Sequence, residues 1–280
     1  VDNLTTGRLK NLPKHPRLKF LKKDISACKP EDFPDQIDGI AHLAATPSVT
    51  ESWLQPLEAH HNNLSVTISV MQLIQTLKIA RLVFASSAAV YGNPIQVPVT
   101  EDHPTSPLSP YGLQKLVCEQ YANLFAKSFD FSFVGLRLFN VFGARQVPNS
   151  PYSGVISIFV SAMQQNLPIT IYGDGRQTRD FVYVKDVAIA FTKALTLPLA
   201  PGSCYSCNLG TGKAITLLEL VDILKAQFPQ WKSEVRFAPA RLGDIQHSLA
   251  DISQISSFLN FNPQWSLESA MPFLIASFSG

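Results

Sequence analysis

Short apolar runs alternate with longer segments of helical spacing along the chain. The apolar runs suit buried strands and are Leu18–Leu21, Ile37–Leu43, Leu82–Ala85, Phe131–Leu138, Ile169–Tyr172, Phe181–Val184, Cys204–Asn208 and Val235–Phe237. The helical segments are Pro56–Leu77, Pro110–Lys127, Gly154–Gln165, Val184–Leu197, Thr216–Phe228 and Ser266–Phe278. Strands that alternate with helices are typical of a parallel sheet covered on both faces. We therefore expect an α/β protein with a doubly wound parallel sheet.

The distribution of loops predicts two unequal parts. The proline-dense segments Pro94–Pro107 and Pro148–Pro151 are long enough to serve as substrate loops rather than plain connections. From about Pro148 onward, loops and short elements become more frequent. We expect a larger domain over residues 1–147 and a smaller α/β lobe over residues 148–280.

Composition and charge exclude several classes of protein. A chain of 280 residues that is 46% hydrophobic can bury a sizeable core and is not a disordered segment. The net charge of +2 is too balanced for a surface that binds nucleic acid. No stretch of the sequence approaches the ~18–20 apolar residues that cross a bilayer, so we expect no membrane span. Four cysteines do not make a disulfide framework, which favours a cytoplasmic protein.

Three residues suggest acid–base chemistry. On a helix that begins near Pro110, Tyr111 and Lys115 are four residues apart and share one face. A nearby ammonium favours the phenolate, so we expect the pKa of Tyr111 to fall towards neutrality and the side chain to act as a base on a sugar hydroxyl. Ser87 follows the apolar run Leu82–Ala85, at the sheet edge where open parallel sheets bind ligands. The alternative is an ordinary surface pair of tyrosine and lysine.

Other candidate sites are weaker. Cys204 and Cys207 have the spacing of a metal or redox pair, but a second pair and suitably spaced histidines are missing. His60 and His61 have no carboxylate or cysteine at ligand spacing. We therefore expect ordinary cysteines, a solvated pair of histidines and no metal.

The motifs around these residues resemble a known family. Phe84–Gly92 (FASSAAVYG) and Ser109–Lys115 (SPYGLQK) are similar to the extended short-chain dehydrogenase/reductases, and among them most similar to the UDP-hexose 4-epimerases. Further matching segments follow in the family's order: His42–Ala45, Arg137–Gly143, Gly173–Gly175, Arg179–Phe181, Asn208–Gly210 and Arg241–Asp244. The resemblance covers nearly the whole chain. It implies a Rossmann-type sheet with a smaller substrate-binding lobe, NAD as cofactor and a UDP-sugar as substrate.

The resemblance also implies a role for individual residues. Tyr111 would be the catalytic base and acid, Lys115 would bind the nicotinamide ribose, and Ser87 would hydrogen-bond the reacting hydroxyl. Further cofactor contacts would come from Asp2, Asn3, Asp24, Ile25, Leu43, Ala44, Ala45, Asn62 or Asn63, and Phe139. Asp2 would end a strand and favour NAD over NADP, because its carboxylate would meet a 2′-phosphate. Substrate contacts would come from Asn140, Tyr172, Arg179, Arg241, Asp244 and Ser248.

Two positions separate the reactions that this family performs. Related dehydratases carry an Asp-Glu pair, and related decarboxylases a Glu, where this chain has Ala88 and Ala89. Alanine cannot transfer a proton, so the resemblance implies epimerisation through a 4-keto sugar.

The resemblance also bears on the choice of substrate. Ser248 aligns with the family position beside the sugar ring, where a small residue admits an N-acetyl group. This favours an N-acetylhexosamine substrate such as UDP-N-acetylglucosamine, or dual specificity with UDP-glucose. The alternative is another enzyme of the family, namely a UDP-glucuronate epimerase, a decarboxylase or a reductase.

Two further expectations concern the start of the chain and its assembly. The family's glycine-rich phosphate loop has no match here, so we expect the chain to lack the first strand, that loop and the first helix. The alternative to an enzyme is then an inactive fragment that only binds a nucleotide sugar.

The apolar positions of residues 64–77 surround most of the helix, which indicates burial against the sheet and a partner subunit. The resemblance implies a homodimer through this helix and the helix of Tyr111.

Overall fold

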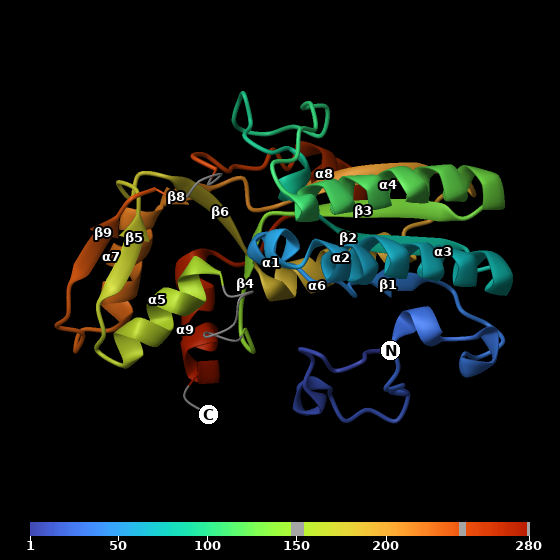
Figure 1. The fold of residues 1–280 in the computed structure, drawn as a ribbon, viewed down its shortest axis with the longest axis horizontal. Coiled ribbons are helices and arrows are strands. Elements are labelled where there is room, and N and C mark those ends of the chain that lie inside the picture. The colour runs from blue at the N-terminus through green and yellow to red at the C-terminus, as the bar shows by residue number, and fades with distance from the viewer. Residues whose placement is uncertain (147–153, 241–244, 279–280) are drawn as a thin grey trace.

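The computed structural model describes residues 1–146, 154–240 and 245–278, and its larger part is built on a parallel sheet (Figure 1). The strands are β1 (Ile40–His42), β2 (Arg81–Ser87), β3 (Ser132–Leu138) and β7 (Cys204–Leu209), in the order β1-β2-β3-β7. Each neighbouring pair is parallel. The carboxyl ends of β2 and β3 therefore lie at the same edge of the sheet, which is where Ser87 is found.

Helices cover both faces of this sheet. On one face are α3 (Val66–Leu77) and α4 (Pro110–Phe129), and on the other are α6 (Val184–Thr196) and α8 (Ser253–Leu259). The side chains of β2 alternate between the two cores: Leu82 and Phe84 pack towards α3 and α4, whereas Val83 and Ala85 pack towards α6 and α8. This explains why the strand is apolar throughout. The prediction of a doubly wound parallel sheet is confirmed.

The second part has its own core and smaller sheets. Strand β5 (Ile169–Tyr172) pairs with β9 (Val235–Ala238), and β6 (Thr178–Tyr183) lies between β4 (Asn140–Phe142) and β8 (Ala214–Thr216). Helices α5 (Val155–Gln164), α7 (Leu217–Gln227) and α9 (Leu267–Phe278) contribute the apolar side chains of this core. Figure 1 shows β4 and β6 running between the two parts. They carry Asn140 and Arg179 to the region beside the main sheet.

The predicted strand Leu18–Leu21 is wrong, and Asp2, expected to end a strand, lies in a single bridge that a turn follows. Asp2 and Lys22 form only an isolated parallel bridge. The Asp2 carboxylate accepts a hydrogen bond from the Leu4 backbone N–H at 2.6 Å, so the chain turns directly after Asp2 and the pairing ends there. The segment instead forms 3-10 turns at Leu9–Asn11, Ile25–Ala27 and Pro30–Asp32.

The predicted helix Pro56–Leu77 is divided by a π-turn. It comprises α2 (Pro56–His60), the turn η4 (His61–Ser65) and α3, and it is preceded by α1 (Val49–Leu54). A π-turn inside a helix often marks a functional site. This one places Asn62 and Asn63 beside the end of β1.

Within the described residues, no helix is both long and apolar enough to span a membrane.

Candidate active site

The start of α4 and the end of β2 bring the three predicted catalytic residues together. Pro110 occupies the first turn of α4, and the Ser109 hydroxyl accepts the otherwise unpaired Gly112 N–H at 3.1 Å. Lys115 donates from Nζ to the carbonyl oxygen of Ala85 in β2 at 2.7 Å. Its ammonium lies 5.8 Å from the centre of the Tyr111 ring. These two residues are therefore part of a built site and not a solvated surface pair.

The pKa of Tyr111 departs from the expectation. Burial raises it, although a hydrogen bond with Ser87 acts in the opposite direction. Lys115 does not lower it, because the Lys115 ammonium is directed to the backbone of β2 instead of the phenol oxygen. Burial also lowers the pKa of Lys115, to about 8. The prediction that Lys115 brings the pKa of Tyr111 towards neutrality is wrong, since that pKa is raised.

A cavity of about 410 Å³ opens beside these residues. Its lining includes the predicted residues Ser87, Tyr111, Phe139, Asn140, Arg179 and Ser248. Phe139 was expected on the cofactor side, yet it lies here. Tyr172 lies at the end of β5 and does not line this cavity, and Arg241 and Asp244 fall outside the described residues.

Backbone contacts hold the far wall of this cavity in place. Arg179 donates from Nη1 to the carbonyl oxygens of Thr178 and Ile245, at 2.9 and 2.7 Å. The Ser248 backbone N–H donates to the same Thr178 carbonyl at 3.2 Å. The wall also includes His247, whose Nδ1 lies 3.2 Å from the Thr178 hydroxyl. Residues from both parts of the chain therefore enclose one space.

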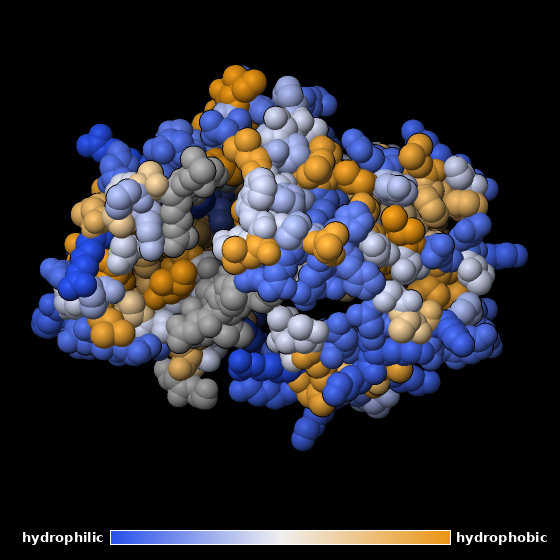
Figure 2. All heavy atoms as spheres, viewed as in Figure 1, coloured by the Kyte–Doolittle hydropathy of each residue, from blue (hydrophilic) through white to orange (hydrophobic). Residues whose placement is uncertain are grey.

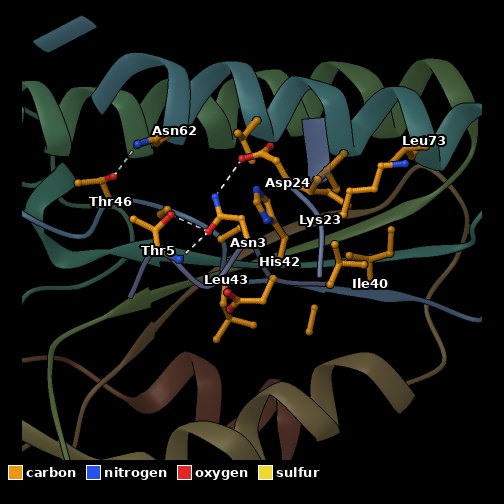
Figure 3. Close-up of a pocket in the computed structure, with 18 of the residues that line it drawn as sticks. Asn3, Thr5, Lys23, Asp24, Ile40, His42, Leu43, Thr46, Asn62 and Leu73 are labelled. Atoms are coloured by element: carbon orange, nitrogen blue, oxygen red, sulfur yellow. Dashed lines mark hydrogen bonds between the residues drawn. The ribbon is translucent and has the colours of Figure 1, made fainter. Parts of the chain in front are cut away.

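A second cavity, of about 630 Å³, lies at the carboxyl end of β1 (Figure 3). It brings together most of the predicted cofactor residues, namely Asp2, Asn3, Asp24, Ile25, Leu43, Ala44, Ala45 and Asn62. Asn3 donates from Nδ2 to the Asp24 carboxylate at 3.0 Å. The hydroxyl and backbone N–H of Ser26 lower the pKa of Asp24, so this carboxylate is charged.

The chemistry of this second cavity fits a dinucleotide. The carboxylates of Asp2 and Asp24 can accept hydrogen bonds from ribose hydroxyls and would repel a 2′-phosphate. Ala44 and Ala45 are small, so the backbone after β1 leaves space for a ligand. Pockets of this volume are typical of cofactor sites. The residues present therefore fit NAD better than NADP.

The two neighbouring asparagines have different surroundings. Asn62 lines the second cavity and donates to the Thr46 hydroxyl at 3.1 Å. Asn63 is buried, accepts from the Thr46 backbone N–H at 2.7 Å and donates to Gln114 Oε1 at 2.7 Å. Asn63 therefore ties the loop after β1 to α4, on which Gln114 lies between Tyr111 and Lys115.

Several polar residues near the site were missed by the sequence reasoning. The Ser52 hydroxyl accepts the Tyr111 backbone N–H at 3.1 Å and so joins α1 to the start of α4. Gln114, Thr46 and His247 also have no signal of their own in the sequence. Their contacts are made only when distant segments meet, and pattern alone does not reveal this.

The cysteines and histidines considered above as metal or redox candidates do not form such a site within the described residues. All four cysteines are free thiols, with Cys207 buried and Cys204 half-buried on β7. His60 and His61 are exposed. Across residues 1–146, 154–240 and 245–278, the structure contains no group of three or more histidine, cysteine or acidic side chains that could hold a metal ion.

Comparison with known proteins agrees with this arrangement. The family model described as "NAD dependent epimerase/dehydratase family" matches residues 1–210. A putative UDP-glucose 4-epimerase of Methanocaldococcus jannaschii is 37% identical over 277 residues, which are 97% of this chain and 87% of that protein.

Two solved structures are also similar. The UDP-N-acetylglucosamine 4-epimerase of Methanobrevibacter ruminantium, in complex with UDP-N-acetylmuramic acid, superposes with a TM-score of 0.93 at 35% identity, covering 99% of this chain and 89% of that one. The UDP-glucose 4-epimerase of Thermotoga maritima, with UDP-glucose, gives a TM-score of 0.90 at 29% identity and the same coverage. The chain belongs to the NAD-dependent epimerase/dehydratase family.

Proposed function

We propose that this protein is an NAD-dependent 4-epimerase of a UDP-sugar. One observation carries the proposal: Ser87 and Tyr111 line a cavity whose neighbouring positions, Ala88 and Ala89, have no group that transfers a proton. Elimination of water needs such a group, whereas epimerisation at C4 needs one acid–base residue and a hydride acceptor. The similar proteins named as 4-epimerases support the same reaction.

In the proposed reaction Tyr111 takes the proton of the C4 hydroxyl and later returns it. Ser87, which hydrogen-bonds Tyr111, orients that hydroxyl, and Lys115 holds its ammonium beside the ring of Tyr111, bonded to the carbonyl of Ala85. NAD, when bound, would supply the acceptor for the hydride of C4 and the donor that returns it to the other face of the sugar. Asp2, Asn3, Asp24 and Asn62 would hold the cofactor in the second cavity.

The substrate cavity supports a preference for the N-acetylated sugar. Ser248 is a small residue on the lining of this cavity, as is Ser87 at the end of β2. Arg179 would contact the diphosphate, as an arginine suits that group. We infer that UDP-N-acetylglucosamine is a substrate and that UDP-glucose is accepted as well.

Substitution of Ser248 tests this preference together with the function. Ser248→Tyr should fill the space beside the sugar and lower kcat/KM for UDP-N-acetylglucosamine at least about tenfold, with a much smaller effect on UDP-glucose. The 4-epimers formed from each substrate are quantified by chromatography. Ser257→Tyr, at an exposed position of α8, is the matched control. Equal losses for both substrates would contradict the assignment of Ser248.

We also propose that residues 1–147 are the NAD-binding domain and that residues 148–280 form mainly the substrate lobe. Among the residues that the structure describes, those lining the second cavity all fall within the first 79 positions, which supports the first assignment. The cavity at Ser87 also has Arg179, Ile245, His247 and Ser248 of the second part on its lining.

We also propose that the protein works in the cytoplasm. Its four cysteines are free thiols, which agrees with a reducing compartment.

A homodimer is the assembly we propose. Helices α2, α3 and α4 pack side by side, and exposed apolar side chains lie along α2 and α4. These are Leu57, Leu113, Tyr121 and Leu124. Figure 2 shows hydrophobic side chains at the surface over these helices. A second copy packed on this face would bury them in a bundle of helices. Sedimentation should give twice the chain mass of 30.8 kDa.

A further inference from the structure

A buried polar network lies directly behind the catalytic residues. Its centre is the ion pair of Glu119 on α4 and Arg137 on β3, with Arg137 Nη2 and Glu119 Oε2 2.8 Å apart. Arg137 Nε donates to the same carboxylate at 3.1 and 3.3 Å. Both side chains are buried. Such a pair costs desolvation energy and is weak evidence for stability, so a functional role has to be considered.

Glu119 also holds the strand end that carries Ser87. The Ser86 hydroxyl donates to Glu119 Oε1, and the Ser206 hydroxyl of β7 donates to Oε2 at 3.2 Å. Ser86 directly precedes Ser87, whose hydroxyl bonds Tyr111. One carboxylate therefore connects α4 with three strands of the sheet. It fixes the helix of Tyr111 and Lys115 relative to the strand of Ser87.

Arg137 also donates a hydrogen bond to a second side chain, that of Tyr91. Its Nη1 donates to the Tyr91 hydroxyl oxygen at 2.8 Å, and the Tyr91 hydroxyl donates to Asn208 Oδ1 at 2.6 Å. The Asn208 backbone N–H donates to the Glu101 carboxylate at 2.7 Å. Tyr91 lines the cavity at Ser87, so the network reaches the floor of the proposed substrate site.

Glu119 is the one acidic side chain of α4, and its charge acts to raise the pKa of Lys115 against the effect of burial. The two residues are four apart on α4 and share a face. Of the other groups around Lys115, burial raises the pKa of the Cys118 thiol and lowers the pKa of His42 on β1 to about 3, so both are neutral near pH 7. Tyr111 is neutral because burial raises its pKa. Arg137 of β3 is bonded to the Glu119 carboxylate through Nε and Nη2.

We propose that Glu119, held by Arg137, is a positioning residue of the reaction: it anchors the end of β2 beside Ser87 and supplies the negative charge that keeps the Lys115 ammonium in the site. This role rests on the proposed 4-epimerase function. Glu119 touches neither cavity and acts only through Ser86 and Lys115. Glu119 has no signal of its own in the sequence, and Arg137 stands there only as the first residue of the segment Arg137–Gly143.

The test uses the pH dependence of kcat in the full chain. Burial sets the pKa of Lys115 to about 8, and the charge of Glu119 opposes that lowering. Since Lys115 acts in its charged form, activity should fall as the pH rises through this value. In Glu119→Gln the fall should begin at a lower pH than in the wild-type protein. Asp222→Asn, which removes the carboxylate of an exposed ion pair with Lys225, should leave the profile unchanged.

A double variant separates this role from simple stability. Glu119→Gln leaves Arg137 buried and unpaired, which lowers the melting temperature. Glu119→Gln combined with Arg137→Gln removes both charges and should recover much of the melting temperature while retaining the shifted pH profile. If both variants keep the wild-type profile, or if the shift disappears in the double variant, the proposal is overturned.

A second readout does not depend on the reaction. The ionisation of Lys115 can be followed by NMR of protein carrying 13C at the lysine ε-carbon, with the signal assigned by its loss in Lys115→Met. Both Glu119 variants should titrate at lower pH than the wild-type protein. If the wild-type protein lacks 4-epimerase activity, the proposed function fails, while an unchanged titration of Lys115 would overturn the role of Glu119 alone.

Discussion

Replacement of Tyr111 by phenylalanine should reduce kcat for 4-epimerisation by roughly 10³-fold, because the phenol oxygen is the acid–base group of the proposed reaction. The substitution removes one oxygen and one hydrogen bond with Ser87, and it leaves the ring in place. KM should therefore change little, and the melting temperature should stay close to that of the wild-type protein. Steady-state kinetics with UDP-N-acetylglucosamine and a thermal scan measure the two effects.

A matched control lies on the same helix. Tyr121 is exposed on α4, and Tyr121→Phe should retain wild-type kcat. A Tyr111→Phe variant that keeps more than about a tenth of the activity would contradict the role assigned to Tyr111, since positioned acid–base groups contribute ~10²–10⁴-fold.

The second large effect that we expect is a loss of folding stability at low pH, caused by His42. His42 is buried on β1 with its Nε2 2.9 Å from the Thr67 hydroxyl, and burial lowers its pKa from 6.5 to about 3. Between these two values the unfolded chain binds a proton that the folded protein does not. The free energy of unfolding therefore falls as the pH drops from 6.5 towards 3, by roughly 3 kcal/mol at pH 4.

Urea unfolding at pH 7 and pH 4 measures this contribution. His42→Gln should be less stable than the wild-type protein at pH 7, because the buried contact with Thr67 is altered, but it should lose less stability between pH 7 and pH 4. His60→Gln, at an exposed position, should show the full wild-type loss. An identical pH dependence in His42→Gln and the wild-type protein would exclude His42 as the source.

The main sheet could be predicted from the sequence because its strands are apolar on both faces. Leu82–Ala85 has no period-two alternation, and the structure shows β2 packed by helices on both sides. The short strands β4 and β8 were missed, because three residues such as Asn140–Phe142 carry no recognisable period. The segment Leu18–Leu21 is largely apolar but forms no strand, and the adjacent Lys22 makes only an isolated bridge with Asp2.

The candidate site was predictable only in part. Tyr111 and Lys115 share a helix, so their spacing alone placed them together, and Ser87 followed from the position of a strand end. The direction of the Tyr111 pKa was not predictable, because it depends on burial and on the contact of Lys115 with Ala85. The network of Glu119 and Arg137 was equally hidden, since it joins a helix and a strand that meet only in the fold.

The fate of the hydrogen on C4 tests the central claim most directly. The protein is incubated with NAD and with UDP-N-acetylglucosamine that carries deuterium at C4, and the products are separated and weighed by mass spectrometry. The proposed reaction predicts the C4 epimer with its deuterium retained, no change of mass and no net reduction of NAD. Recovery of unchanged substrate, loss of the label to water, or a product that has lost water or carbon dioxide would contradict 4-epimerisation.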